Sequence, residues 1–159
     1  MVGSQAERFP QIAHRVVTAG HAVGSHTYSH LDHHVVTPDQ AVADMVRGAE
    51  AVGNVVGFEP RLYRAPYGHF SPETVAEARR RGWTCVLWTA LGFDWEKSAT
   101  PRSVAGHVVP DLEAGTIVLL HDARRAKPQD PAPVTGATAI LLDEIERRGL
   151  RAVAVGDIL

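Results

Sequence analysis

The chain has 159 residues, 45% of them hydrophobic and 21% charged, with a formal net charge of -2. This composition is typical of one globular domain and excludes a disordered segment or a membrane-embedded bundle. No run of Lys and Arg indicates a nucleic-acid partner. No stretch approaches the ~20 apolar residues of a membrane span, and the N-terminus lacks the pattern of a signal peptide, so the sequence itself gives no localisation.

Helical and apolar segments alternate along the chain. The expected helices cover residues 7–19, 37–52, 71–80, 101–112 and 138–148. The expected strands cover residues 21–25, 61–64, 84–89, 115–120 and 151–155, and residues 124–136 read as a surface loop. Apolar strands that take turns with helices indicate a parallel α/β architecture, either a barrel or an open sheet. In such folds, functional side chains lie at the C-terminal ends of strands.

Two imidazoles follow the first expected strand. His26 and His30 are four residues apart, so one helical turn would present both to a single metal ion. Two His leave the coordination shell of an ion such as zinc incomplete, and a third ligand has to come from elsewhere. The alternative is a pair of surface or capping His. His33 and His34 lie on a different spacing and are treated as bystanders.

Two further loops carry candidate residues. Arg64 ends the second strand and could clamp a carboxylate, while the rigid turn at Pro66, Tyr67 and Gly68 could present a backbone N–H to an oxyanion. Without other evidence this is a turn with one charged residue. Cys85 lies in the third strand, where a buried core position is expected, and as the single Cys it excludes an intrachain disulfide.

The last two candidate segments follow the remaining strands. Asp94 could fix the tautomer of a neighbouring His, and Trp95 could line a pocket. His121 ends an apolar run and is a candidate general acid. In isolation each could also be a packing residue of a loop.

The ordered set His26-x-x-x-His30, Arg64-Ala-Pro-Tyr67-Gly, Asp94-Trp95 and Leu119-Leu-His121-Asp resembles the polysaccharide deacetylases of the NodB-homology type, carbohydrate esterase family 4. The resemblance covers essentially the whole chain and implies one domain over residues 1–159, folded as a distorted (β/α) barrel. It implies a hydrolase that removes acetyl groups from the N-acetylated sugars of a polysaccharide such as chitin or peptidoglycan. Family members are commonly secreted or lie at the cell envelope.

The resemblance also implies a role for each matching residue. His26 and His30 would bind a divalent metal, with zinc expected, and Arg64 would orient the catalytic base. The backbone N–H of Tyr67 would stabilise the oxyanion. In the second half of the chain, Trp95 and Leu119 would enclose the acetyl methyl group. Asp94 would fix the tautomer of His121, which would act as the proton donor.

One family motif has no counterpart here. Family members carry an early Thr-Phe-Asp-Asp-Gly, whose two Asp supply the base and the third metal ligand, and this sequence contains no Asp-Asp pair. The expectation is a domain truncated at its N-terminus, which lacks the third ligand. Asp32 could offer a carboxylate, but its spacing does not match.

Three explanations for the missing motif stay open. They are a start assigned too late, a genuine inactive fragment, and a protein that binds without turnover. The alternative functions are a non-catalytic carbohydrate-binding or interaction module and an amidase on a small non-sugar substrate. The oligomeric state is not predicted.

Overall fold

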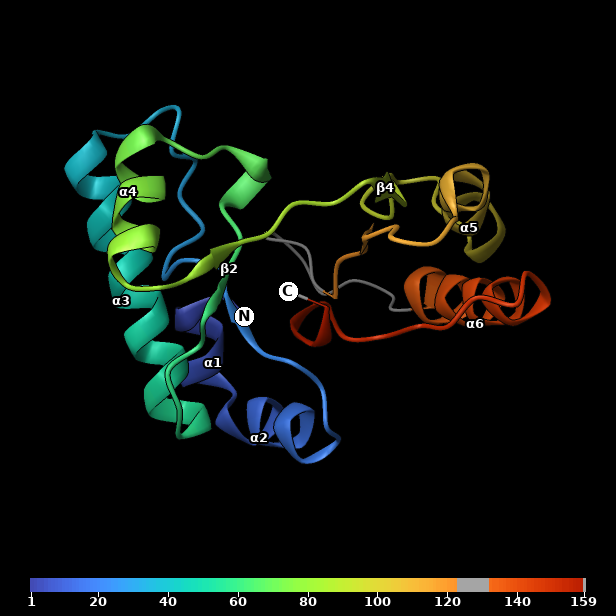
Figure 1. Cartoon of the computed structure of the whole chain (residues 1–159), viewed down its shortest axis with the longest axis horizontal. Helices are drawn as coiled ribbons and strands as arrows, with labels where there is room; N and C mark the ends of the chain where they lie inside the picture. The colour runs from blue at the N-terminus through green and yellow to red at the C-terminus, as the bar shows by residue number, and fades with distance from the viewer. Residues whose placement is uncertain (123–131, 159) are drawn as a thin grey trace. The chain divides into compact units, whose positions relative to one another are not determined.

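The computed structural model describes residues 1–122 and 132–158 (Figure 1). By its internal contacts the chain divides into two compact units, Met1–Leu87 with Ala154–Leu159, and Trp88–Val153. Each unit is treated below by itself, and the single-domain organisation expected for residues 1–159 stays a prediction. No helix among the described residues has both the length and the apolar character that crossing a bilayer requires.

Three parallel strands form the sheet of the first unit, in the order β1 (Gly24–Ser25), β2 (Leu62–Tyr63) and β3 (Thr84–Cys85). Because the strands are parallel, the segments that follow β1 and β2 leave the sheet at the same edge. The chain start lies along β1, since the His26 N–H donates to the Met1 carbonyl at 2.8 Å. The parallel α/β arrangement predicted from the sequence is therefore confirmed in this unit.

The helices of the first unit are α1 (Gly3–Arg8), α2 (Pro10–Thr18), α3 (Pro38–Val56) and α4 (Pro72–Arg80), with short 3₁₀ turns η1 (Pro66–Gly68) and η3 (Val155–Asp157). The long helix α3 packs against α1, α2, α4 and β1 (Figure 1). It begins at the predicted capping box, in which the Thr37 hydroxyl accepts from the Gln40 N–H at 3.3 Å. It ends at Val56, four residues later than predicted, and the next residue, Gly57, has the left-handed φ of 85° that suits a helix end.

Two buried clusters hold the first unit together. Met45, Ala49, Tyr63, Ala65, Ala78 and Trp83 form one, and Ala6, Val23 and Val52 form the other. The expected single helix over residues 7–19 is wrong. Pro10 starts α2, and Phe9 before it has φ -131° and ψ 57°, because a residue that precedes proline avoids the helical region.

The second unit contains β4 (Ala90–Leu91) and β5 (Val118–Leu119), which pair in parallel, with Leu91 opposite Leu119. Its helices are α5 (Pro101–Val108) and α6 (Ala132–Arg147), with the 3₁₀ turn η2 (Val109–Asp111) between α5 and β5. The two helices pack against each other (Figure 1). Their shared core consists of Ala90, Val104, Ala105, Val108, Ala137 and Leu141.

Four local expectations need correction. Residues 84–89 do not form one strand, since β3 ends at Cys85 and belongs to the first unit. Cys85 is exposed, not buried, because β3 is an edge strand of its sheet. Residues 151–154 form no strand, and Val155 begins η3. The loop expected over 124–136 is helical from Ala132 onward, and its earlier part lies outside the described residues.

Candidate active site

A tight turn after β1 brings His26 and His30 together. Their ring centroids are 4.8 Å apart and the ring planes are nearly perpendicular. The sequence argument assumed a helical turn here, and that is wrong. Instead, Thr27 and His30 have φ values of 61° and 58°, and these two left-handed residues fold the chain back on itself.

Helix α3 supports this turn with a buried carboxylate. Both oxygens of Asp44 lie 3.1 Å from the Ser29 N–H, and the backbone carbonyl of Asp44 accepts from the Tyr28 N–H at 3.0 Å. Within the turn, the His30 N–H donates to the Thr27 hydroxyl at 3.0 Å. The backbone of the turn is therefore fixed by α3 and not only by its own residues.

His26 is oriented as a metal-ligating imidazole would be. Its Nδ1 lies 2.7 Å from the carbonyl oxygen of Arg64, and since a carbonyl can only accept, Nδ1 carries the proton. The lone pair is then on Nε2, the atom available to a metal. Burial lowers the pKa of His26 from 6.5 to about 3, so the ring is in the neutral form that ligation requires.

The segment after β2 forms the neighbouring loop. The Arg64 N–H donates to the Ser25 carbonyl at 3.0 Å, which continues the pairing of β1 with β2. Tyr67 and Gly68 follow Pro66 with φ values of 59° and 75° and reverse the chain. The Tyr67 ring then lies 5.1 Å from the His30 ring. The structure thus brings His26, His30, Arg64 and Tyr67 into one neighbourhood.

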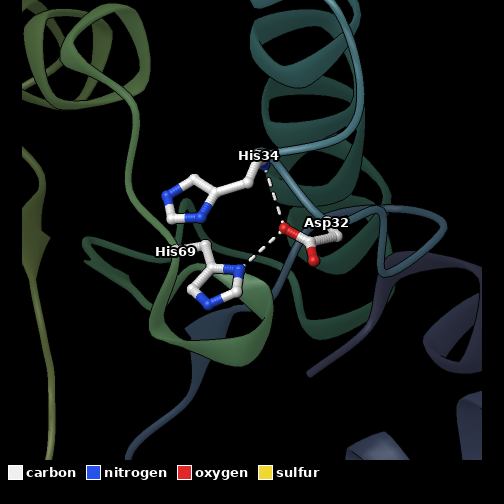
Figure 2. A group of neighbouring side chains, drawn as sticks. All are labelled: Asp32, His34 and His69. Carbon is white, nitrogen blue, oxygen red and sulfur yellow. Dashed lines mark hydrogen bonds and ion pairs between the residues drawn. The ribbon is translucent and has the colours of Figure 1, made fainter.

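The donor chemistry of both imidazoles and the tautomer of His26 fit a zinc-type ion with the two rings as ligands. Among residues 1–122 and 132–158, three metal-ligating side chains gather at one other place, formed by Asp32, His34 and His69. Asp32 Oδ1 accepts from the His34 N–H at 2.9 Å and pairs with His69 Nδ1 at 2.8 Å (Figure 2). These two hydrogen bonds lower the pKa of the Asp32 carboxyl. The structure therefore directs Asp32 toward His69 and not into the His26 and His30 pair.

The second unit holds the other predicted residues. Asp94 follows β4, is 1% exposed, and accepts two hydrogen bonds of 3.0 Å from the backbone N–H and Nδ1 of His121. The carboxylate therefore keeps the proton on Nδ1 and leaves the lone pair on Nε2. The Trp95 ring lies 5.2 Å from His121, edge to face, and Leu119 is buried at the end of β5.

Backbone strain coincides with these segments. The described chain has four non-glycine residues with positive φ: Thr27, His30, Tyr67 and Phe93. Thr27, His30 and Tyr67 lie within predicted motif segments and Phe93 directly precedes Asp94. Each such residue costs on the order of 1–3 kcal/mol. The surrounding structure therefore has to offset this cost at each of the four positions.

The sequence argument missed several residues. Asp44 and Gly48 of α3 support the His turn, and nothing in the local pattern of an amphipathic helix marks them. His69 was not singled out, and His34 was treated as a bystander. A high local density of His beside a carboxylate was the signal for the group around Asp32, but the approach of His69 depends on the fold.

The sequence of this chain is similar to those of several named proteins. The profile of the family described as polysaccharide deacetylase matches residues 1–86. A peptidoglycan-N-acetylglucosamine deacetylase of Bacillus cereus is 31% identical over 161 residues, which cover 100% of this chain and 73% of the relative. A chitooligosaccharide deacetylase of Bradyrhizobium is 28% identical, over 94% of this chain and 71% of the relative.

A solved structure is also similar. The crystal structure of a peptidoglycan N-acetylglucosamine deacetylase superposes with a TM-score of 0.87 and 26% identity, over 98% of this chain and 71% of that one. The match of the family profile to more than half of the chain and the similarity to the Bacillus cereus relative lead to one assignment. This chain belongs to the polysaccharide deacetylase family of carbohydrate esterases.

Proposed function

We propose that this chain is a metal-dependent hydrolase that removes acetyl groups from the N-acetylated sugars of a polysaccharide. The observation that carries the proposal is the state of His26, which is neutral, half-buried and hydrogen-bonded through Nδ1 to the Arg64 carbonyl, with the ring centroid of a second imidazole 4.8 Å away. Bound by His26 and His30, a divalent metal such as zinc would polarise the acyl carbonyl and lower the pKa of water.

The remaining roles in the first unit belong to the loop after β2. The strained turn at Tyr67 presents its backbone N–H as a fixed donor to the developing oxyanion, which needs no reorganisation during the reaction. Arg64 would orient the carboxylate base through its guanidinium, but the Asp-Asp pair that supplies this base in the family has no counterpart in these 159 residues. The 159 residues contain no Asp-Asp pair, so we expect this chain alone to retain zinc poorly and to hydrolyse slowly.

In the second unit, His121 protonates the departing amine. Asp94 holds His121 in the tautomer with the proton on Nδ1, because its carboxylate lies 3.0 Å from that atom. Trp95, which is 41% exposed, and Leu119 bound the space for the acetyl methyl group. The distorted (β/α) barrel expected from the resemblance belongs to this proposal as well.

The substrate class follows from the relatives. One is named for peptidoglycan N-acetylglucosamine and another for chitooligosaccharides. Both names describe polymers of sugars with an acetamido group, so we propose that group, on an oligosaccharide or polysaccharide, as the site of hydrolysis. Deacetylation leaves a free amine on the sugar and releases acetate.

The test measures acetate release from N-acetylated chitooligosaccharides with added zinc. We expect slow release that zinc stimulates, that falls at least ~100-fold in His121→Ala and Asp94→Asn, and that is unchanged in His21→Ala, an exposed His control. Release that is insensitive to His121→Ala would overturn the proposal. So would saturable sugar binding without acetate release, retained in the His26→Ala/His121→Ala double variant, which would indicate a binding module.

A further inference from the structure

We propose that Asp32, His34 and His69 form a second divalent-metal site, distinct from the His26 and His30 pair. Each of the three side chains offers one ligand atom, and these atoms lie within 4.8 Å of one another. Two imidazoles and one carboxylate are a donor set that suits zinc, copper(II) or nickel(II) better than calcium or magnesium.

Hydrogen bonds hold the Asp32 carboxylate in place between the two histidines. The His34 N–H donates to Asp32 Oδ1 at 2.9 Å and fixes the carboxylate, and His69 Nδ1 approaches the same oxygen at 2.8 Å. The His34 and His69 rings stack with centroids 3.9 Å apart and planes 7° from parallel (Figure 2). Residues from two separate loops therefore meet at one carboxylate.

The distances require only side-chain movement. Ligand bonds of about 2.0–2.1 Å in a tetrahedral shell place ligand atoms roughly 3.4 Å apart. The 2.8 Å between His69 Nδ1 and Asp32 Oδ1 would open to that value, and the longer separations, at most 4.8 Å, would close to it as the rings rotate out of their stack. The side chains of His69 and Asp32 are 38% and 25% exposed, so the ion can enter from solvent and keep water in a fourth position.

The Tyr67 ring lies near both this group and the His26 and His30 pair. Its ring centroid lies 5.1 Å from that of His30 and 5.9 Å from that of His69. The two candidate metal positions are therefore neighbours that share no ligand, with an aromatic ring in contact with both. His34, which is exposed, contributes only to the second position and can be changed without disturbing the core.

The experiment titrates the full chain with zinc alone, without substrate, and follows the side-chain nitrogens of ¹⁵N-labelled His by NMR and the stoichiometry by calorimetry. We expect saturable shifts of the His34 and His69 nitrogens. We expect the affinity of this site to fall about tenfold or more in His34→Ala and in Asp32→Asn, with His21→Ala as the exposed control. These shifts should persist in His26→Asn/His30→Asn, while the signals of the other pair are lost.

Two outcomes would overturn the second site. One is zinc shifts confined to His26 and His30. The other is an affinity and stoichiometry that His34→Ala leaves unchanged, and this single surface variant decides the question even where the His26→Asn/His30→Asn protein does not fold. Neither outcome depends on acetate release, so the failure of this proposal is distinguishable from the failure of the deacetylase assignment.

Discussion

Gly48 is the position at which α3 meets the turn that carries His26 and His30. A Cβ atom at Gly48 would lie 2.2 Å from the carbonyl carbon of Thr27 and 2.5 Å from the backbone nitrogen of Tyr28. Both are backbone atoms, so no change of rotamer relieves the overlap. Gly48→Ala must therefore move either the helix or the turn.

Gly48→Ala should lower the free energy of unfolding, although alanine has a higher helix propensity than glycine. Replacing Gly by Ala in a helix interior stabilises by roughly 0.5–1 kcal/mol when the methyl group is accommodated. Here the contact must open by more than an ångström, and overpacking of this kind costs typically ~1–3 kcal/mol. Displacement of the turn also weakens the bond from the Ser29 N–H to Asp44, worth about 1.5–3 kcal/mol for a charged acceptor. We expect Gly48→Ala to lower the free energy of unfolding by about 2 kcal/mol.

The assay is urea denaturation followed by circular dichroism, with two glycine controls. Gly106→Ala in α5 places its Cβ with nothing within 4 Å, so that variant should be stabilised by roughly 0.5–1 kcal/mol. Gly53→Ala lies in α3 itself, and its nearest contact is 3.2 Å, so its effect should fall between the other two. A Gly48→Ala protein as stable as the wild type, with unchanged zinc shifts at His26, would refute this account of the turn.

Four further variants test the strain at Tyr67, the buried carboxylate of Asp44 and the ion pairs of Glu77. Tyr67→Gly should be about 1 kcal/mol more stable in urea than Tyr67→Ala, because only Gly accepts a φ of 59° without penalty, and equal stabilities would contradict this. Asp44→Asn should speed hydrogen exchange of the Ser29 amide at least ~10-fold, since the amide loses a charged acceptor, and unchanged protection would exclude the role given to Asp44. The Glu77 carboxylate accepts hydrogen bonds from the side chains of Arg80 and Arg81, and these bonds lower its pKa to about 2. Its contribution to stability, at most about 1 kcal/mol for a surface pair, is therefore present above pH 4.5 and lost as the pH falls through 2. Urea midpoints of Glu77→Gln and the wild type should differ at pH 7 and converge toward pH 2, and a gap that persists at pH 2 would contradict the assignment.

The helices whose ends carry capping residues were predictable from the sequence. Thr37 and Ser71 start α3 and α4 as expected, because capping is a local interaction among four consecutive residues. The helix over 7–19 failed for an equally local reason, the effect of Pro10 on Phe9. The strand expected at 151–155 failed differently, since an apolar run becomes a strand only where a partner strand is available.

Some residues of the candidate site could likewise be predicted from the sequence, and others could not. The sequence indicated four residues because their side chains are unusual at strand ends: His26, His30, Asp94 and His121. The structure places the ring centroids of His26 and His30 4.8 Å apart, and the Asp94 carboxylate 3.0 Å from His121 Nδ1. Their roles in catalysis stay predictions. The approach of His69 to Asp32 could not be predicted, because 37 residues separate them and only the parallel pairing of β1 with β2 brings their loops together.

The supports of the His turn show why such positions escape sequence reasoning. Asp44 and Gly48 are four residues apart in α3, so they share one face of the helix, where one binds the turn and the other leaves room for it. Neither residue carries chemistry of its own, and a polar residue and a glycine on a helix usually indicate a solvated face. Here that face lies against two left-handed residues that cost on the order of 1–3 kcal/mol each. The stabilisation that offsets this strain therefore comes from α3, and the geometry of the His26 and His30 pair depends on residues outside the motif that contains the two imidazoles.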